Sequence, residues 1–85
     1  MTEANSFEPT QVTCYSGRTY ADRPASFVWQ DKKYMVKEVE REWQEPGQKH
    51  FVVTARGEKG EKDDKRFELC YIEQDDIWWL KELEI

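Results

Sequence analysis

The chain has 85 residues, enough for one domain, because a chain of this length buries only about 60–65% of the surface that it exposes when unfolded. Charged residues make up 36% of it and the net charge is -5, which argues against a general affinity for nucleic-acid phosphates. Aromatic residues make up 14%, and such large side chains in so polar a sequence predict a small core built mainly from rings.

The charge is unevenly distributed along the chain. Between Gln11 and Lys37 there are five basic and two acidic residues, whereas from Glu38 to Ile85 there are eight basic and fourteen acidic ones. The first ten residues lack the basic region and apolar run of a secretory signal, and nowhere do about 18 apolar residues follow one another. We therefore expect a cytoplasmic protein that makes no contact with a membrane.

Residues 1–10 contain little apolar material and are expected to form a flexible N-terminal tail, followed by a single small β domain at 11–85. In that domain apolar residues recur with a period of two, which is typical of strands. Val12 and Cys14 share one side of the first strand, and Phe27 and Trp29 share one side of the second. Three further alternating segments follow, at 34–43, 50–55 and 66–72.

The alternation changes phase once inside the segment 34–43. Tyr34 and Val36 have even numbers, whereas Val39 and Trp43 have odd ones. One extra residue near Lys37 or Glu38, a β-bulge, would bring all four side chains onto one face and bend the strand. The sequence therefore predicts a bulge at this point and a core position for Trp43.

Turn signals separate the predicted strands. The sequences QDKK (30–33), EPGQ (45–48) and EQDD (73–76) predict tight turns, and the Pro-Gly pair is the strongest of these signals. The charged stretch RGEKGEKDDKR (56–66) holds two glycines and no aliphatic residue, so it predicts a long mobile hairpin loop.

The last segment, IWWLKELEI (77–85), fits either a strand or one turn of helix, and a strand is favoured. The predicted fold is therefore all-β: a small antiparallel meander of about six strands, as a strongly bent sheet or a partly open SH3-like barrel. Cys14 and Cys70 are each expected to be a buried, reduced thiol, with a disulfide between neighbouring strands as the alternative.

Residues with catalytic or metal-binding chemistry occur without recognisable partners. His50 has no nucleophile or orienting carboxylate at a characteristic spacing, so it is interpreted as a hairpin-edge histidine. The acidic pairs at 63–64 and 75–76 match no cation-binding loop, and the four glycines form no phosphate-binding array. We expect no enzyme activity, no cofactor and no bound metal.

Aromatic and basic residues interleave between Tyr15 and Trp43. Such a surface on a small β domain can stack bases or hold an extended peptide. Trp29 and Tyr34 are expected in the core, because so small a chain needs its large rings inside. The candidate binding residues are therefore those in or near the loop that leads into the hairpin: Tyr15, Arg18, Tyr20, Arg23 and Lys32.

The order of these segments resembles a small bacterial domain family of unknown function. The resemblance rests on RPxxFxW (23–29), YxVxxV (34–39), Trp43, FxV (51–53), FELxY (67–71) and WxL (78–80), and covers Val12 to about Leu83. Similar segments stand alone or lie at the C-terminus of bacterial proteins related to error-prone DNA polymerases. The resemblance implies an accessory binding role and brings no catalytic residues.

Two hypotheses about function follow from these observations. The first is a non-enzymatic interaction module that binds a protein partner or a single-stranded nucleic-acid segment. The alternative is a self-associating structural protein, a homodimer formed through a sheet edge, since C2 dimers are the commonest oligomers. A small enzyme is a third possibility that no set of residues in the sequence supports.

Overall fold

The computed structural model describes residues 7–14, 23–59 and 62–83, and these ranges form seven strands. The strands are β1 (Glu8–Thr10), β2 (Val12–Cys14), β3 (Pro24–Trp29), β4 (Lys32–Glu45), β5 (Gln48–Gly57), β6 (Lys65–Ile72) and β7 (Ile77–Leu83). They make one antiparallel sheet in the order β1-β7-β6-β5-β4-β3-β2, which confirms the predicted all-β meander. Within these ranges no helix is long and apolar enough to cross a membrane.

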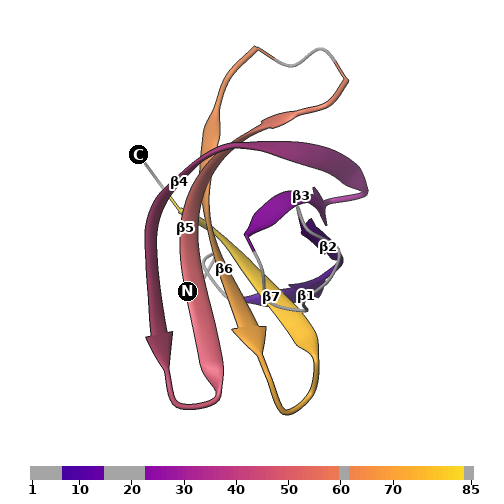
Figure 1. Ribbon diagram of the computed structural model, residues 1–85. Coiled ribbons are helices and arrows are strands. Elements are labelled where there is room, and N and C mark those ends of the chain that lie inside the picture. The colour runs from indigo at the N-terminus through magenta and orange to yellow at the C-terminus, as the bar shows by residue number, and fades with distance from the viewer. Residues whose placement is uncertain (1–6, 15–22, 60–61, 84–85) are drawn as a thin grey trace, which may run out of the picture.

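The sheet is strongly curled, as predicted, and its two ends approach each other through the segment 8–14 (Figure 1). β1 pairs with β7 and β2 pairs with β3, so the short stretch around Gln11 spans the two edges of the sheet. The Val28 amide donates to the Gln11 carbonyl at 3.2 Å, and the Thr10 hydroxyl donates to the Val28 carbonyl. The curled sheet therefore has the shape of a half-barrel, and the segment 8–14 links its two ends.

The ordered sheet begins earlier than the sequence indicates. Residues 8–10 fall inside the segment expected to be a tail, yet they form β1 because their backbone can pair with Trp78, Trp79 and Leu80 at the edge of β7. This pairing accounts for a seventh strand where about six were expected. Residues 1–6 lie outside the described ranges.

The turns and the last strand agree with their predictions. Gln30 and Asp31 both adopt positive φ angles, 53° and 64°, as a two-residue hairpin turn requires, and Gly47 takes a φ of 77°. β7 is a strand, so the ambiguity in its sequence is resolved by pairing along its whole length with β6. Between β5 and β6, β5 continues to Gly57 and β6 begins at Lys65, which makes the loop shorter than expected.

β4 contains the predicted bulge and a second one. Val36 pairs with Ala55 and Glu38 with Thr54, so Lys37 is an extra residue, at the predicted position. Val39 then pairs with Val53 and Arg41 with Val52, so Glu40 is a second extra residue. Each extra residue reverses which face the following side chains occupy, because side chains alternate along a strand. Val39 therefore lies inside, whereas Trp43 lies outside.

The core fills the concave face of the curl. Phe67 lies at the centre of this core. The centroid of its ring is 4.9 Å from that of Phe27, 5.2 Å from that of Trp29 and 5.4 Å from that of Tyr34. Tyr34 is buried in the core, as expected, whereas Trp29 is half-buried and packs against it. The buried cluster is Phe27, Tyr34, Phe51, Val53, Ala55, Phe67, Leu69, Tyr71, Trp78 and Leu80.

The convex face also carries apolar residues. Val52 and Cys70 point away from the core cluster, yet each is at least nine-tenths buried by neighbouring side chains on the outer surface. Cys14 packs against the concave core instead. Neither cysteine forms a disulfide, and the two lie on opposite faces of the sheet, which excludes a bond between them. Cys14 is half-buried rather than buried.

Candidate binding surface

Two of the five residues that the sequence predicts for binding, Arg23 and Lys32, lie in the described ranges, and these two lie at opposite ends of β3. Tyr15, Arg18 and Tyr20 lie outside the described ranges. Arg23 precedes β3 and its guanidinium lies 3.9 Å from the Glu42 carboxylate, whereas Lys32 pairs with Trp29 at the other end of β3. Arg23 and Lys32 are thus separated by the length of a six-residue strand, roughly 20 Å.

A different set of residues forms a continuous row on the convex face. Trp43 on β4 pairs in register with His50 on β5, His50 with Cys70 on β6, and Cys70 with Trp79 on β7. Residues directly opposite each other on neighbouring strands point to the same face. The outer aromatic row, as we name Trp43, His50, Cys70 and Trp79, therefore crosses four strands at right angles to their direction.

Trp43 is held in place by two neighbours. Its indole ring lies parallel to the His50 imidazole, with 4.9 Å between the ring centroids and 4° between the planes. The guanidinium carbon of Arg41, two residues earlier on β4, lies 5.0 Å from the centroid of the indole. Both contacts are of the kind that stabilises an aromatic ring on a surface, so the half-buried Trp43 is a fixed feature of this face.

His50 is the polar centre of the row. Its side chain is only 12% exposed, and its Nε2 lies 3.1 Å from Gln48 Oε1 and 3.6 Å from Glu45 Oε1. Its Nδ1 lies 3.5 Å from Glu68 Oε2 but has no hydrogen-bond partner in the described part of the chain. Two carboxylates therefore flank the imidazole, which the spacing of the sequence does not reveal.

Cys70 adjoins His50 but is not activated as a nucleophile. Burial raises the pKa of its thiol above the ordinary value, and the negative charges of Glu68 and Glu45 raise it further. A reactive cysteine needs a lowered pKa and a positive neighbour, because the thiolate is the attacking species. The Sγ atom lies 3.9 Å from Gln48 Oε1, to which it is a weak donor. The environment thus favours a packed, neutral thiol.

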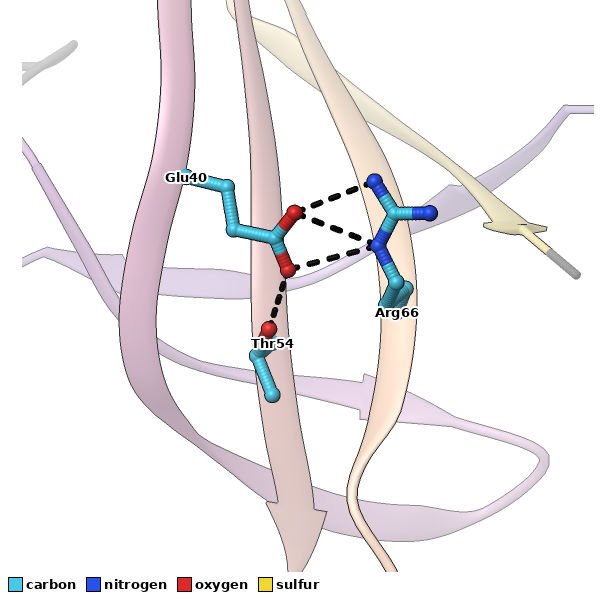
Figure 2. Close-up of polar contacts among 3 residues, drawn as sticks. All are labelled: Glu40, Thr54 and Arg66. Atoms are coloured by element: carbon cyan, nitrogen blue, oxygen red, sulfur yellow. Dashed lines mark hydrogen bonds and ion pairs between the residues drawn. The ribbon is translucent and has the colours of Figure 1, made fainter. Parts of the chain in front are cut away.

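A polar network of Glu40, Thr54 and Arg66 lies on three neighbouring strands (Figure 2). Glu40, the second extra residue of β4, accepts hydrogen bonds from the Thr54 hydroxyl and from Arg66 Nε and Nη2, the latter at 3.0 Å. The bonds from Thr54 and Arg66 hold the pKa of the Glu40 carboxyl below its usual range. The network ties β4, β5 and β6 together and fixes the strand distortion that turns Trp43 outward.

The outer aromatic row has no metal centre beside it in the part of the chain that the structure describes. Within residues 7–14, 23–59 and 62–83, no group of three or more His, Cys, Asp and Glu side chains is placed to hold a metal ion. An open depression of about 360 Å³ lies elsewhere, between β1 and the β3–β4 turn, and is lined mainly by polar residues. The outer aromatic row offers a partly apolar surface on the convex face, with the Trp43 ring held by Arg41 and His50.

The sequence contained one signal for this surface, which the period-two interpretation overlooked. The strands β5, β6 and β7 contain the runs FVV, LCYI and WWL, in which apolar residues follow one another without alternation. Such runs indicate strands that are apolar on both faces. The register that brings Trp43, His50, Cys70 and Trp79 into one row depends on the second bulge, and no residue pattern marks that bulge.

The protein is a small all-β domain made of one curled sheet. Its concave face is filled by a core of aromatic and aliphatic side chains, and its convex face is also partly apolar. The chain belongs to the family described as Domain of unknown function (DUF6504), whose family model matches residues 1–79. No curated protein and no solved structure matches the chain.

Proposed function

We propose that the protein is a non-enzymatic interaction module that binds a protein partner through the outer aromatic row. The observation that carries this proposal is the position of Trp43 and Trp79, which share one row on the convex face while the concave core is filled by other rings. Fixed aromatic side chains on a surface are enriched where proteins bind one another.

The charges around the row favour a protein over a nucleic acid. Glu45 and Glu68 flank His50, and the turn after β6 adds exposed Glu73 and Asp75. A surface that stacks the bases of a single strand also needs cations along the phosphates. Because carboxylates lie in those positions, a polyanion is repelled from the row.

Affinity capture with matched variants tests the proposal. Immobilised wild-type protein, Trp43→Ala and Trp79→Ala are compared with Met35→Ala, which removes an apolar side chain that is 40% exposed on β4 but outside the row. We expect proteins that are retained by the wild type and by Met35→Ala but lost from both Trp variants. Equal retention by all four proteins would overturn the proposal.

The nucleic-acid version is tested separately. Short single-stranded DNA and RNA are titrated at low salt while amide chemical shifts are followed. Shifts at Arg18, Arg23 and Lys32 would support binding through the residues that the sequence nominated, and shifts at the indole groups of Trp43 and Trp79 would make the row itself a nucleic-acid surface. Unchanged spectra would leave the protein partner as the ligand class.

Self-association through a sheet edge is the alternative, and one edge open to it is the part of β4 beyond its pairing with β3, residues 36–45. The two bulges and a charged sequence, which includes Lys37, Glu38, Glu40 and Glu42, both weaken strand addition at an edge. The alternative predicts a dimer in light scattering at high concentration, whereas the interaction module predicts a monomer.

The resemblance to domains of error-prone-polymerase-related proteins selects the first partners to examine. We infer that an accessory role in the bacterial cytoplasm is the natural setting for such a module. Capture of a polymerase-related protein that depends on Trp43 would support this setting, and capture of unrelated proteins only would contradict it.

A further inference from the structure

The apolar surface of the outer aromatic row extends toward one end of the sheet. The next outward-facing position, two residues along the strands, pairs Glu45 with Gln48, Gln48 with Ile72, and Ile72 with Ile77. Ile77 is 40% exposed and Ile72 is half-buried, so two branched aliphatic side chains adjoin the Trp79 end of the row. The combined surface can hold apolar side chains of a partner over the four neighbouring strands β4 to β7.

Acidic side chains gather at the same end. The β4–β5 and β6–β7 turns lie side by side at one end of the molecule (Figure 1), joined by a 2.9 Å hydrogen bond from the Glu73 amide to the Gly47 carbonyl. Glu45, Glu73 and Asp75 are all exposed there. Lys49, the lysine nearest this end, pairs in register with Tyr71 and so lies on the inner face.

The cations of the outer face lie against groups of the protein itself. Arg41 lies over the Trp43 ring, Lys81 lies 4.9 Å from the centroid of the Phe7 ring, and Arg66 is bound to Glu40 at 3.0 Å. The register places all three cations further along the strands than Glu45, Glu73 and Asp75, so the turn end of the surface has a negative potential. A partner gains from placing positive charges beside its apolar anchors.

Resting on the proposed function, we propose that the partner presents a linear segment in which lysines or arginines flank one or more large apolar side chains. The apolar side chains lie on Trp43, Trp79, Ile72 and Ile77, and the cations lie beside Glu45, Glu73 and Asp75. The apolar contacts supply affinity, whereas the charges orient the segment and exclude acidic competitors.

Selection from a library of random linear peptides displayed on phage tests this chemistry. Selected peptides are synthesised and their affinities measured against the wild type, Trp43→Ala and the double variant Glu73→Gln/Asp75→Asn. The matched control is Glu58→Gln/Asp63→Asn, which also removes one glutamate and one aspartate charge. These two residues are exposed in the β5–β6 connection, at the other end of the molecule (Figure 1). Circular dichroism checks that each variant is folded.

We expect the selected peptides to combine Lys or Arg with Leu, Met, Phe or Trp. Their affinity should fall about tenfold or more in Trp43→Ala and about three- to tenfold in Glu73→Gln/Asp75→Asn, with a weaker dependence on salt. The control should bind within about twofold of the wild type, as remote surface charges contribute little. The double variant alters only exposed carboxylates, so it remains informative if Trp43→Ala does not fold.

The other outcomes separate this inference from the proposed function. Acidic or uncharged peptides that still require Trp43 would overturn the charge preference and leave the binding module intact. Peptides that bind Trp43→Ala as well as the wild type would overturn both. Failure to select any peptide, or a dimer in light scattering that Trp79→Ala dissociates, would show that a linear basic segment is not what this face holds.

Discussion

The indole of Trp43 lies parallel to the imidazole of His50 on the outer face of the sheet, 4.9 Å away between centroids. Four residues earlier on the same strand, Val39 packs against the core on the inner face. Val39 and Trp43 face opposite sides because Glu40, an extra residue in β4, lies between them and reverses the alternation of side chains. The surface proposed for binding thus exists because of a local irregularity in β4.

Replacement of Trp43 by alanine should destabilise the protein by about 1–2 kcal/mol, because the ring loses its stack on His50 and its contact with Arg41. Chemical denaturation in urea, followed by circular dichroism, measures the change in the free energy of unfolding. Met35→Ala is the control and should stay within about 0.5 kcal/mol of the wild type. A change in Trp43→Ala no larger than that of the control would mean that the stack contributes nothing to stability.

The concave face could be predicted from the sequence because its signal is local. Phe27, Tyr34, Phe51 and Phe67 occur at alternating positions between recognisable turns, and all four lie in the core cluster. The first bulge was predictable for the same reason. Val36 and Val39 are both apolar but lie three positions apart, so they share a face only if one extra residue lies between them. Fold class, turns and most core positions therefore follow from the order of residues alone.

The outer face could not be predicted, because its signal is not local. The second bulge places Trp43 outside, yet the sequence around it, VEREW, is equally compatible with a strand that continues in phase. His50 meets Glu68 and Cys70 only through the register of β5 and β6, which spans about twenty residues of chain. The nominated residues Tyr15, Arg18 and Tyr20 fall outside the described ranges and stay a prediction.

The ion pair between Glu40 and Arg66 should contribute a coupling free energy of about 0.5–1 kcal/mol, since its side chains are partly exposed and solvent weakens the attraction. A double-mutant cycle with Glu40→Gln and Arg66→Gln, measured by urea denaturation, isolates this value. Thr54→Val in the wild-type background separates the contribution of the hydroxyl. Additive effects of the two single substitutions would show that the pair has no coupling.

The same network should make stability fall in acid. The pKa of Glu40 is lowered in the folded state, chiefly by the hydrogen bonds from Thr54 and Arg66, so the unfolded chain takes up the proton first as the pH decreases. The stabilisation is complete above the ordinary glutamate pKa and is lost as the pH falls below it. Unfolding free energies of the wild type and Glu40→Gln, measured from neutral to acidic pH, should therefore converge. A constant difference across that range would contradict this explanation.

Cys70 should react slowly with an alkylating reagent in the folded protein. Its thiol is buried and its pKa is raised by burial, Glu68 and Glu45, so little thiolate is present at neutral pH. In a Cys14→Ala variant, mass spectrometry after timed exposure to iodoacetamide reports on Cys70 alone. The rate should rise sharply at urea concentrations that unfold the chain. A folded-state rate equal to that of the unfolded chain would show that the outer layer does not protect this thiol.

Gly47→Ala should cost about 1 kcal/mol of stability through the backbone alone. Gly47 has a φ of 77°, which an L-residue with a side chain adopts with difficulty, whereas a Cβ built on it meets no atom within 4 Å. The steric surroundings are open, so no repacking obscures the conformational cost. Thermal unfolding of Gly47→Ala and Gly47→Asn distinguishes this cause, because asparagine tolerates the left-handed region better and should lose less stability. Equal losses in the two variants would indicate that the link between Gly47 and Glu73, rather than the φ angle, determines the effect.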